Sequence, residues 1–144
     1  MAGGTSERVL GILTALAGFL IGGFFIFFTA GPALFSDGPD SERWMVVGIG
    51  SAILFVLGLV GGLVAPGSWK AVGIATAAPV VPIVLLMGLP LTFSSGAPAG
   101  MRLLGPVFLA GYFAATLFGA WLGARVRWKQ RARRTSPAEQ QGEI

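Results

Sequence analysis

The sequence predicts an all-α integral membrane protein built as a four-helix bundle. Hydrophobic residues make up 54% of the 144 residues and charged residues only 11%, whereas soluble domains carry about 25% charged residues. So few charged side chains cannot cover a water-facing surface, and most of the surface must therefore face lipid. The chain also contains four apolar runs, each of the roughly 20 residues that a helix needs to cross the hydrocarbon core.

Each apolar run is bounded by residues typical of a membrane helix. The first follows Arg8 and precedes the turn residues Gly38 and Pro39, and the second starts at Trp44, an aromatic residue typical of the membrane interface. A stretch containing Gly96 separates the third run from the fourth. None of the runs contains Asp, Glu, Lys or Arg, which are costly in the hydrocarbon core. The predicted spans are residues 9–34, 44–64, 71–91 and 103–124.

The segments outside the four spans are too short to bury a core of their own. We therefore expect a single membrane domain over residues 1–129. Residues 130–144 should form a cytoplasmic tail that is first basic and then polar and disordered.

The distribution of lysine and arginine predicts the orientation. Short loops rich in these residues are retained on the cytoplasmic side. If both termini lie inside, eight of the ten Lys and Arg residues face the cytoplasm, and only Arg43 and Arg102 lie outside. We therefore expect a multi-pass protein of the cell membrane with both termini cytoplasmic.

The second half of the chain resembles the first. The end of the first span, Pro32 to Gly38, matches the end of the third, Pro90 to Gly96, at four of seven positions. The pair Trp69-Lys70 matches Trp128-Lys129 at an offset of 59 residues. Two helical hairpins related by a parallel repeat would explain these matches. The general tendency of such residues to gather at helix ends and interfaces would explain them equally well.

Small residues recur four positions apart within the spans, and Gly alone occurs 23 times. This spacing lets the backbones of two membrane helices approach closely. It serves packing within the chain as well as pairing of the fourth span with another copy, so both interpretations stay open. The predicted packing residues are Gly18, Gly22, Gly58, Gly62, Gly111, Ala115, Gly119 and Gly123.

Two prolines interrupt the third span near its middle. Pro79 and Pro82 have no N–H group, so the carbonyls of Ala75 and Ala78 lose their usual helical donors. Free carbonyls near the midplane, with the hydroxyl of Thr76, would suit a gate or a binding site. A structural kink is the alternative interpretation.

Six cations follow the fourth span within ten residues. At this position they should meet the anionic headgroups of the bilayer, each contributing about 1 kcal/mol near the surface. Attraction to nucleic acid would be unspecific, and we expect no nucleic-acid partner. The predicted headgroup residues are Arg125, Arg127, Lys129, Arg131, Arg133 and Arg134.

The composition excludes several chemistries. Without His or Cys the chain lacks the commonest general base and the usual zinc ligands, so we expect no catalytic residues, bound metal or cofactor. The leading hypothesis is a non-enzymatic accessory or assembly subunit that acts by helix packing on a membrane-protein partner. The alternative is a channel or carrier for a small neutral or apolar solute, formed by a homo-oligomer.

Overall fold

The computed structural model describes residues 3–35, 40–93, 95–96 and 99–140, and it is 95% helical with no strand in this described part. Four helical segments are long and apolar enough to cross a membrane. These results confirm the predicted all-helical fold with four candidate spans. The segments are Gly4–Thr29, Ser41–Val64, Pro66–Leu86 and Arg102–Arg134.

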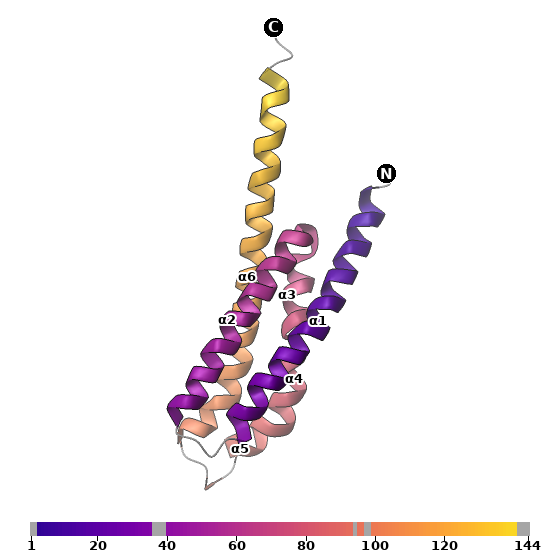
Figure 1. Ribbon diagram of the computed structural model, residues 1–144. Helices are drawn as coiled ribbons and strands as arrows, with labels where there is room; N and C mark the ends of the chain where they lie inside the picture. Colours follow the sequence, from indigo (N-terminus) through magenta and orange to yellow (C-terminus); the bar gives the residue numbers. More distant parts are fainter. Residues whose placement is uncertain (1–2, 36–39, 94, 97–98, 141–144) are drawn as a thin grey trace.

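The first hairpin consists of α1 (Gly3–Phe35) and α2 (Asp40–Val64) (Figure 1). Long uninterrupted helices are expected here, because a helix satisfies its own main-chain groups where no water is present. The helix α2 ends where Pro66, which lacks an N–H group, opens the short 3-10 helix η1 (Pro66–Ser68).

The third span is divided into short pieces rather than being one regular helix. A turn at Ala78 and Pro79 ends the first piece, and a π-helical segment follows one turn later. The predicted break at the prolines is therefore present, whereas the π-helical segment was not predicted. The pieces are α3 (Trp69–Ala77), α4 (Val80–Ile83), the π-helix η2 (Val84–Gly88) and α5 (Leu89–Phe93).

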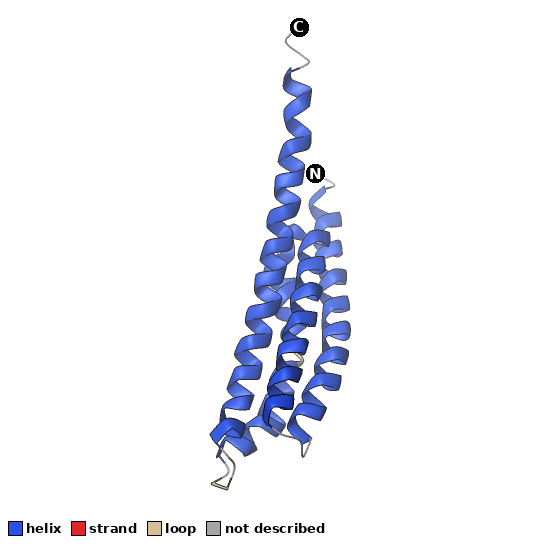
Figure 2. Cartoon of the chain, turned by 60° about the vertical axis from the view of Figure 1, so that its left-hand side comes forward, coloured by secondary structure: helices blue, strands red, loops and turns tan. Residues whose placement is uncertain are grey.

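The last helix, α6 (Ala99–Gln140), continues well past the predicted end of the fourth span. We expected a disordered tail over residues 130–144, but the chain stays helical to Gln140, and residues 141–144 lie outside the described part. Arg, Lys, Gln and Ala dominate after Gly123, and all four favour the helix. At 42 residues α6 is about 63 Å long, roughly twice the hydrocarbon thickness of about 30 Å. Residues 125–140, which we name the stalk, project beyond the bundle (Figure 2).

The helices pack in two parallel pairs. Both chain termini lie at one end of the bundle, which we name the basic end, and the opposite end is the loop end (Figure 1). The contact between α2 and α6 is the most extensive, and α1 leans mainly on α3 and α2. Only 17% of the most apolar stretch of α1 is buried, against 39% in α6. The helix α1 is therefore the least enclosed of the four spans.

The apolar core lies in the half of the bundle nearer the loop end. Its largest members are Phe108 and Tyr112, whose rings meet edge to face with centroids 5.0 Å apart. Such aromatic pairs add stabilisation beyond the area that they bury. The core residues are Ile26, Val47, Leu54, Val80, Val84, Leu104, Phe108 and Tyr112.

Candidate functional site

Four of the predicted packing glycines form the seam between α2 and α6. A Cβ atom on Gly58 would lie 3.1 Å from Thr116 Cα and nearer still to the Thr116 carbonyl oxygen. On Gly62 it would lie 2.9 Å from Ala120 Cα. The opposing atoms belong to the main chain and cannot turn aside as a side chain could. The close approach of these two helices therefore requires glycine at both positions.

The seam is reciprocal, because α6 presents its own glycines to α2. A Cβ on Gly119 would lie 3.0 Å from Leu59 N, and one on Gly123 would lie 2.9 Å from Leu63 N. Each glycine also faces a carbonyl oxygen of the opposite helix. This geometry is that of Cα–H···O contacts between closely packed helices, each worth about 0.5–1 kcal/mol. The structure thus places these glycines at an interface inside the chain.

The remaining packing candidates differ in how tightly they are placed. Gly18 and Gly22 of α1 both lie against Thr76 of α3, where a Cβ on Gly22 would lie 3.1 Å from the Thr76 carbonyl carbon. A Cβ on Gly111 would lie 3.8 Å from Ser51 Oγ, an ordinary van der Waals contact. Ala115 is half-buried. Larger residues could therefore fit at Gly111 but not at Gly22.

A hydrogen bond joins α6 to α1 at a point where α2 also approaches closely. The hydroxyl oxygens of Tyr112 on α6 and Thr29 on α1 are 3.2 Å apart. Gly50 on α2 makes room for this pair, since a Cβ there would lie 2.8 Å from Tyr112 Cζ and 3.2 Å from Thr29 Oγ1. The sequence analysis did not identify these residues. The signal was present, because Tyr112 is the chain's single tyrosine and lies within an apolar span, where its hydroxyl needs a partner.

The broken third span offers fewer free polar groups than its sequence suggests. The carbonyl of Ala78 accepts a hydrogen bond from Val81 N at 3.0 Å. The hydroxyl of Thr76, which is 1% exposed, donates to Val72 O at 2.8 Å. Of the predicted midplane groups, Ala75 is half-buried and Pro82 is exposed, and Pro79 packs against α1, 3.3 Å from an ideal Cβ on Gly23.

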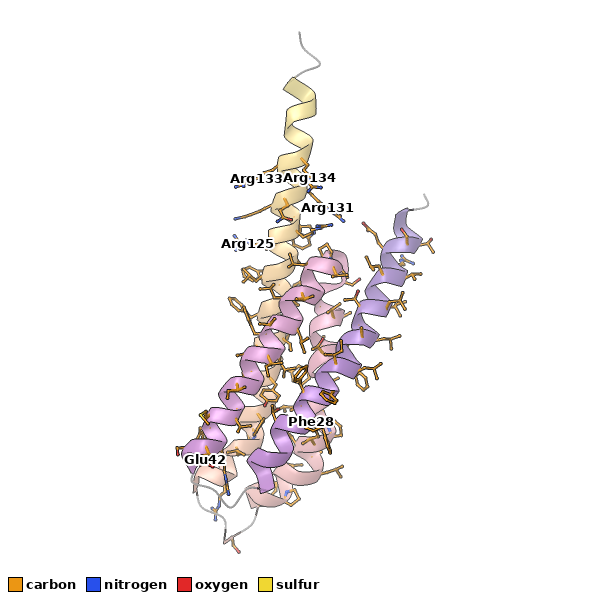
Figure 3. The ribbon with its side chains drawn as sticks, viewed as in Figure 1. Phe28, Glu42, Arg125, Arg131, Arg133 and Arg134 are labelled. Atoms are coloured by element: carbon orange, nitrogen blue, oxygen red, sulfur yellow. The ribbon has the colours of Figure 1, made fainter. Side chains whose placement is uncertain are left out.

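The cations of the stalk are exposed and lie around most of the helix. All six predicted headgroup residues lie on the solvent-accessible surface beyond the bundle, and Figure 3 shows Arg125, Arg131, Arg133 and Arg134 on the emerging part of α6. The guanidinium of Arg125 lies 5.1 Å from the ring centre of Trp121, a cation–π contact. The six cations cover about two thirds of the circumference of the stalk, and Trp128 lies in the remaining sector.

A second basic feature joins the stalk to the start of α1. Arg131 lies 3.8 Å from Glu7, and both side chains are exposed, by 58% and 71%. A cleft of about 350 Å³ opens beside this ion pair. We name it the basic cleft, and its walls include Glu7, Arg8, Leu10, Val64, Ser68, Trp128 and Arg131.

An apolar groove of about 340 Å³ lies next to the basic cleft, one turn further along α1. The two share Val64 as a common wall. We name it the α1–α2 groove, and its walls include Leu13, Ala17, Gly18, Ile21, Leu57, Val60 and Gly61. A separate groove of about 450 Å³ runs along the other side of α1 against α3, past Ala15 and Ala75.

Two charged features lie at the loop end. Arg43, which the orientation prediction places on the outer side, is only 6% exposed at the first turn of α2. Arg102 donates to Ser95 O at 3.0 Å. Of the acidic residues near Arg43, only the side chain of Glu42 is described, and it is exposed (Figure 3). Within the described residues no group of three or more His, Cys, Asp or Glu side chains could hold a metal ion.

The side of α1 away from the bundle carries an aromatic ridge, formed by Phe24, Phe27 and Phe28. Their exposed fractions are 58%, 65% and 58%. The ring centroids of Phe24 and Phe28 are 4.6 Å apart, and those of Phe27 and Phe28 are 5.9 Å apart. The three rings therefore support one another, and Phe24 also meets the half-buried ring of Phe25 edge to face, with centroids 5.7 Å apart.

Comparison of the chain with family models, curated proteins and solved structures finds no match.

Proposed function

We propose that this protein is a non-enzymatic accessory or assembly subunit that acts through helix packing in the membrane. The observation that carries the proposal is the unequal burial of its helices. The glycine faces of α2 and α6 are buried on each other, whereas α1 leaves its aromatic ridge uncovered. We further propose that it lies in the cell membrane with both termini cytoplasmic, since the basic end holds most of its cations.

The occupant that fits the aromatic ridge is a transmembrane helix of another membrane protein. Helices associate in lipid through packing rather than through a hydrophobic driving force. The rings of Phe24 and Phe27 both contact the ring of Phe28, and together they form a protrusion suited to such packing. Phenylalanine also lacks the polar tip with which Tyr and Trp anchor at the interface. Pairing of two copies through the fourth span has less support, because Gly119 and Gly123 are already occupied by α2.

The internal duplication belongs to the same proposal. Equivalent helices of the two hairpins run parallel and pack as α1 on α3 and α2 on α6. In the seam the contacts are reciprocal, since Gly58 and Gly62 of α2 meet α6, and Gly119 and Gly123 of α6 meet α2. Two hairpins with this origin should assemble when residues 1–67 and 68–144 are co-expressed as separate chains. Failure of the two halves to co-purify would argue against it.

Photo-cross-linking tests the accessory role. A photoreactive residue at Phe28 should cross-link to one defined membrane protein, whereas the same residue at Val56, an equally exposed position on α2, should not. Native mass spectrometry of the protein extracted in mild detergent should show the same partner at fixed stoichiometry. Recovery of a monomer alone, or equal cross-linking at both positions, would contradict the proposal.

The second candidate is a channel or carrier for a small neutral or apolar solute. It is favoured by the segmented third span, because π-helical turns such as Val84–Gly88 often occur at functional sites. A symmetric homo-oligomer in native mass spectrometry would favour this candidate over the accessory role. Its weakness is that the hydroxyl of Thr76 and the carbonyl of Ala78 already have partners inside the chain.

A further inference from the structure

We infer that the basic cleft and the α1–α2 groove together bind one anionic phospholipid. Its phosphate would lie between Arg8 and Arg131, and one acyl chain would lie between α1 and α2. This inference does not depend on the proposed partner, which would contact the aromatic ridge nearer the loop end.

The polar end of the site has the charge and the donors for a phosphate. Arg8 and Arg131 from different helices face one carboxylate, Glu7, which leaves a net charge of +1 in the cleft. Arginine forms paired, charge-assisted hydrogen bonds with phosphate. The existing pair between Arg131 and Glu7 is long, at 3.8 Å, and exposed, so a phosphate can compete with it.

Two further residues suit a headgroup at this position. Ser68 adds a hydroxyl at the start of α3, and Trp128 contributes an aromatic ring of the kind that lies at the membrane interface. Figure 3 shows Arg131 extending from α6 on the side of α1, whereas Arg125 extends on the other side. The basic cleft therefore lies between the charged side chains of α1 and Arg131 of the stalk.

The apolar end of the site has most of the length of one lipid chain. From Leu13 to Ile21, the part of α1 that lines the groove, the helix rises about 12 Å, compared with about 15 Å for half of the hydrocarbon core. Leu13 and Ile21 of α1 and Leu57 of α2 wall the groove, while Ala17 and Gly61 keep it open. Because Val64 lines both the groove and the cleft, and Leu10 in the cleft is one turn from Leu13 in the groove, one lipid lying along α1 would contact both.

The charge of the cleft favours an anionic lipid over a zwitterionic one. A choline headgroup would bring a cation next to Arg8 and Arg131, whereas a glycerol headgroup leaves the phosphate charge uncompensated. Purified full-length protein titrated with phosphatidylglycerol should therefore retain one lipid in native mass spectrometry under activation that removes phosphatidylcholine. Equal retention of both lipids would overturn the inference.

Charge variants test the polar end. The double variant R8Q/R131Q should bind phosphatidylglycerol roughly 30-fold more weakly, because each cation near the surface contributes about 1 kcal/mol, or about fivefold in affinity. The matched control R133Q/R134Q removes the same charge from two stalk residues that do not line the cleft. These residues are expected to contact the surface of a bilayer, and no bilayer is present in the detergent titration, so the affinity should stay within about threefold. An equal loss in both variants would show diffuse attraction to the stalk and would overturn the site.

Groove variants and a phosphate competition test the apolar end. Ala17→Trp fills the α1–α2 groove and should abolish the retained lipid, whereas Ala15→Trp fills the separate groove beside α3 and should not. Unchanged thermal unfolding of the two variants checks that both are folded. Inorganic phosphate at millimolar concentration should fail to displace the lipid. Displacement by phosphate, or equal retention in both tryptophan variants, would overturn the assignment to a lipid.

Discussion

The hydroxyl oxygens of Tyr112 and Thr29 lie 3.2 Å apart and join α6 to α1 inside the bundle. The Thr29 hydroxyl donates its proton to Phe25 O at 2.8 Å, so Tyr112 is the donor in the bond between the two hydroxyl groups. Tyr112→Phe removes only that donor. We expect the free energy of unfolding in detergent to fall by about 0.6 kcal/mol, the average found for hydrogen bonds between membrane helices.

A double-mutant cycle with Thr29→Val provides the control. If the two hydroxyls interact, the cost of removing both should be smaller than the sum of the single costs by about the same amount. Strictly additive costs would show that the two groups do not stabilise each other.

Gly50→Ala should disturb the same hydrogen bond from a third helix. The added methyl group would lie 2.8 Å from Tyr112 Cζ, so the ring must shift. Overpacking of this kind costs about 1–3 kcal/mol of unfolding free energy. Removing the tyrosine hydroxyl should recover part of this cost, so Gly50→Ala should be milder in the Tyr112→Phe background. A larger cost in that background would contradict the geometry.

Gly62→Ala should destabilise the seam between α2 and α6. The new methyl group would lie 2.9 Å from Ala120 Cα and against its carbonyl oxygen, which forces the helices apart at a cost of about 1–3 kcal/mol. Gly48→Ala is the matched control on the same helix, since nothing lies within 4 Å of its added methyl group. The control should be neutral or slightly stabilising, because alanine favours the helix by up to about 1 kcal/mol. Equal effects at both positions would argue against the seam.

The double variant P79A/P82A separates the two functional candidates. Restoring both N–H groups should join α3 to α4 as one helix, because the carbonyl of Ala75 regains a donor. Under the accessory role the protein should give no glycerol flux in liposomes, before or after the change. Flux in the unchanged protein that the variant lacks would instead identify a channel with its gate at the prolines.

Reporter fusions test the proposed orientation. Green fluorescent protein fused after Ile144 should fluoresce, and alkaline phosphatase at the same position should be inactive, because the cations of the stalk hold this end in the cytoplasm. Replacing the six stalk cations with Gln should produce a mixture of orientations. An active phosphatase on the unchanged protein would reverse the topology.

The number and approximate limits of the spans could be predicted because they depend on local properties. The predicted second span, residues 44–64, ends at the same residue as α2, where Pro66 follows closely. The prolines of the third span likewise predicted the break in that span. The length of α6 could not be predicted from hydropathy, since the stalk is polar and is helical only by propensity.

The candidate sites were less predictable because they depend on which helices meet. The spacing of Gly58 and Gly62 indicated close packing but did not say that the partner was α6 of the same chain. The freedom of the Ala78 carbonyl was overestimated, since a local bond from Val81 N satisfies it. The burial of Arg43 and the cleft beside Arg8 arise from tertiary contacts that no local pattern encodes.

In the seam between α2 and α6 each glycine faces main-chain atoms of the opposite helix, and this determines which substitutions the seam can accept during evolution. Substituting Thr116 or Ala120 leaves their carbonyl oxygens in place, so these buried positions are limited in side-chain size rather than fixed to one residue. Only the four glycines must stay as they are for the helices to remain this close. Relatives of this chain could thus lose nearly all overall similarity and still share a pair of glycines four residues apart on their second and fourth spans.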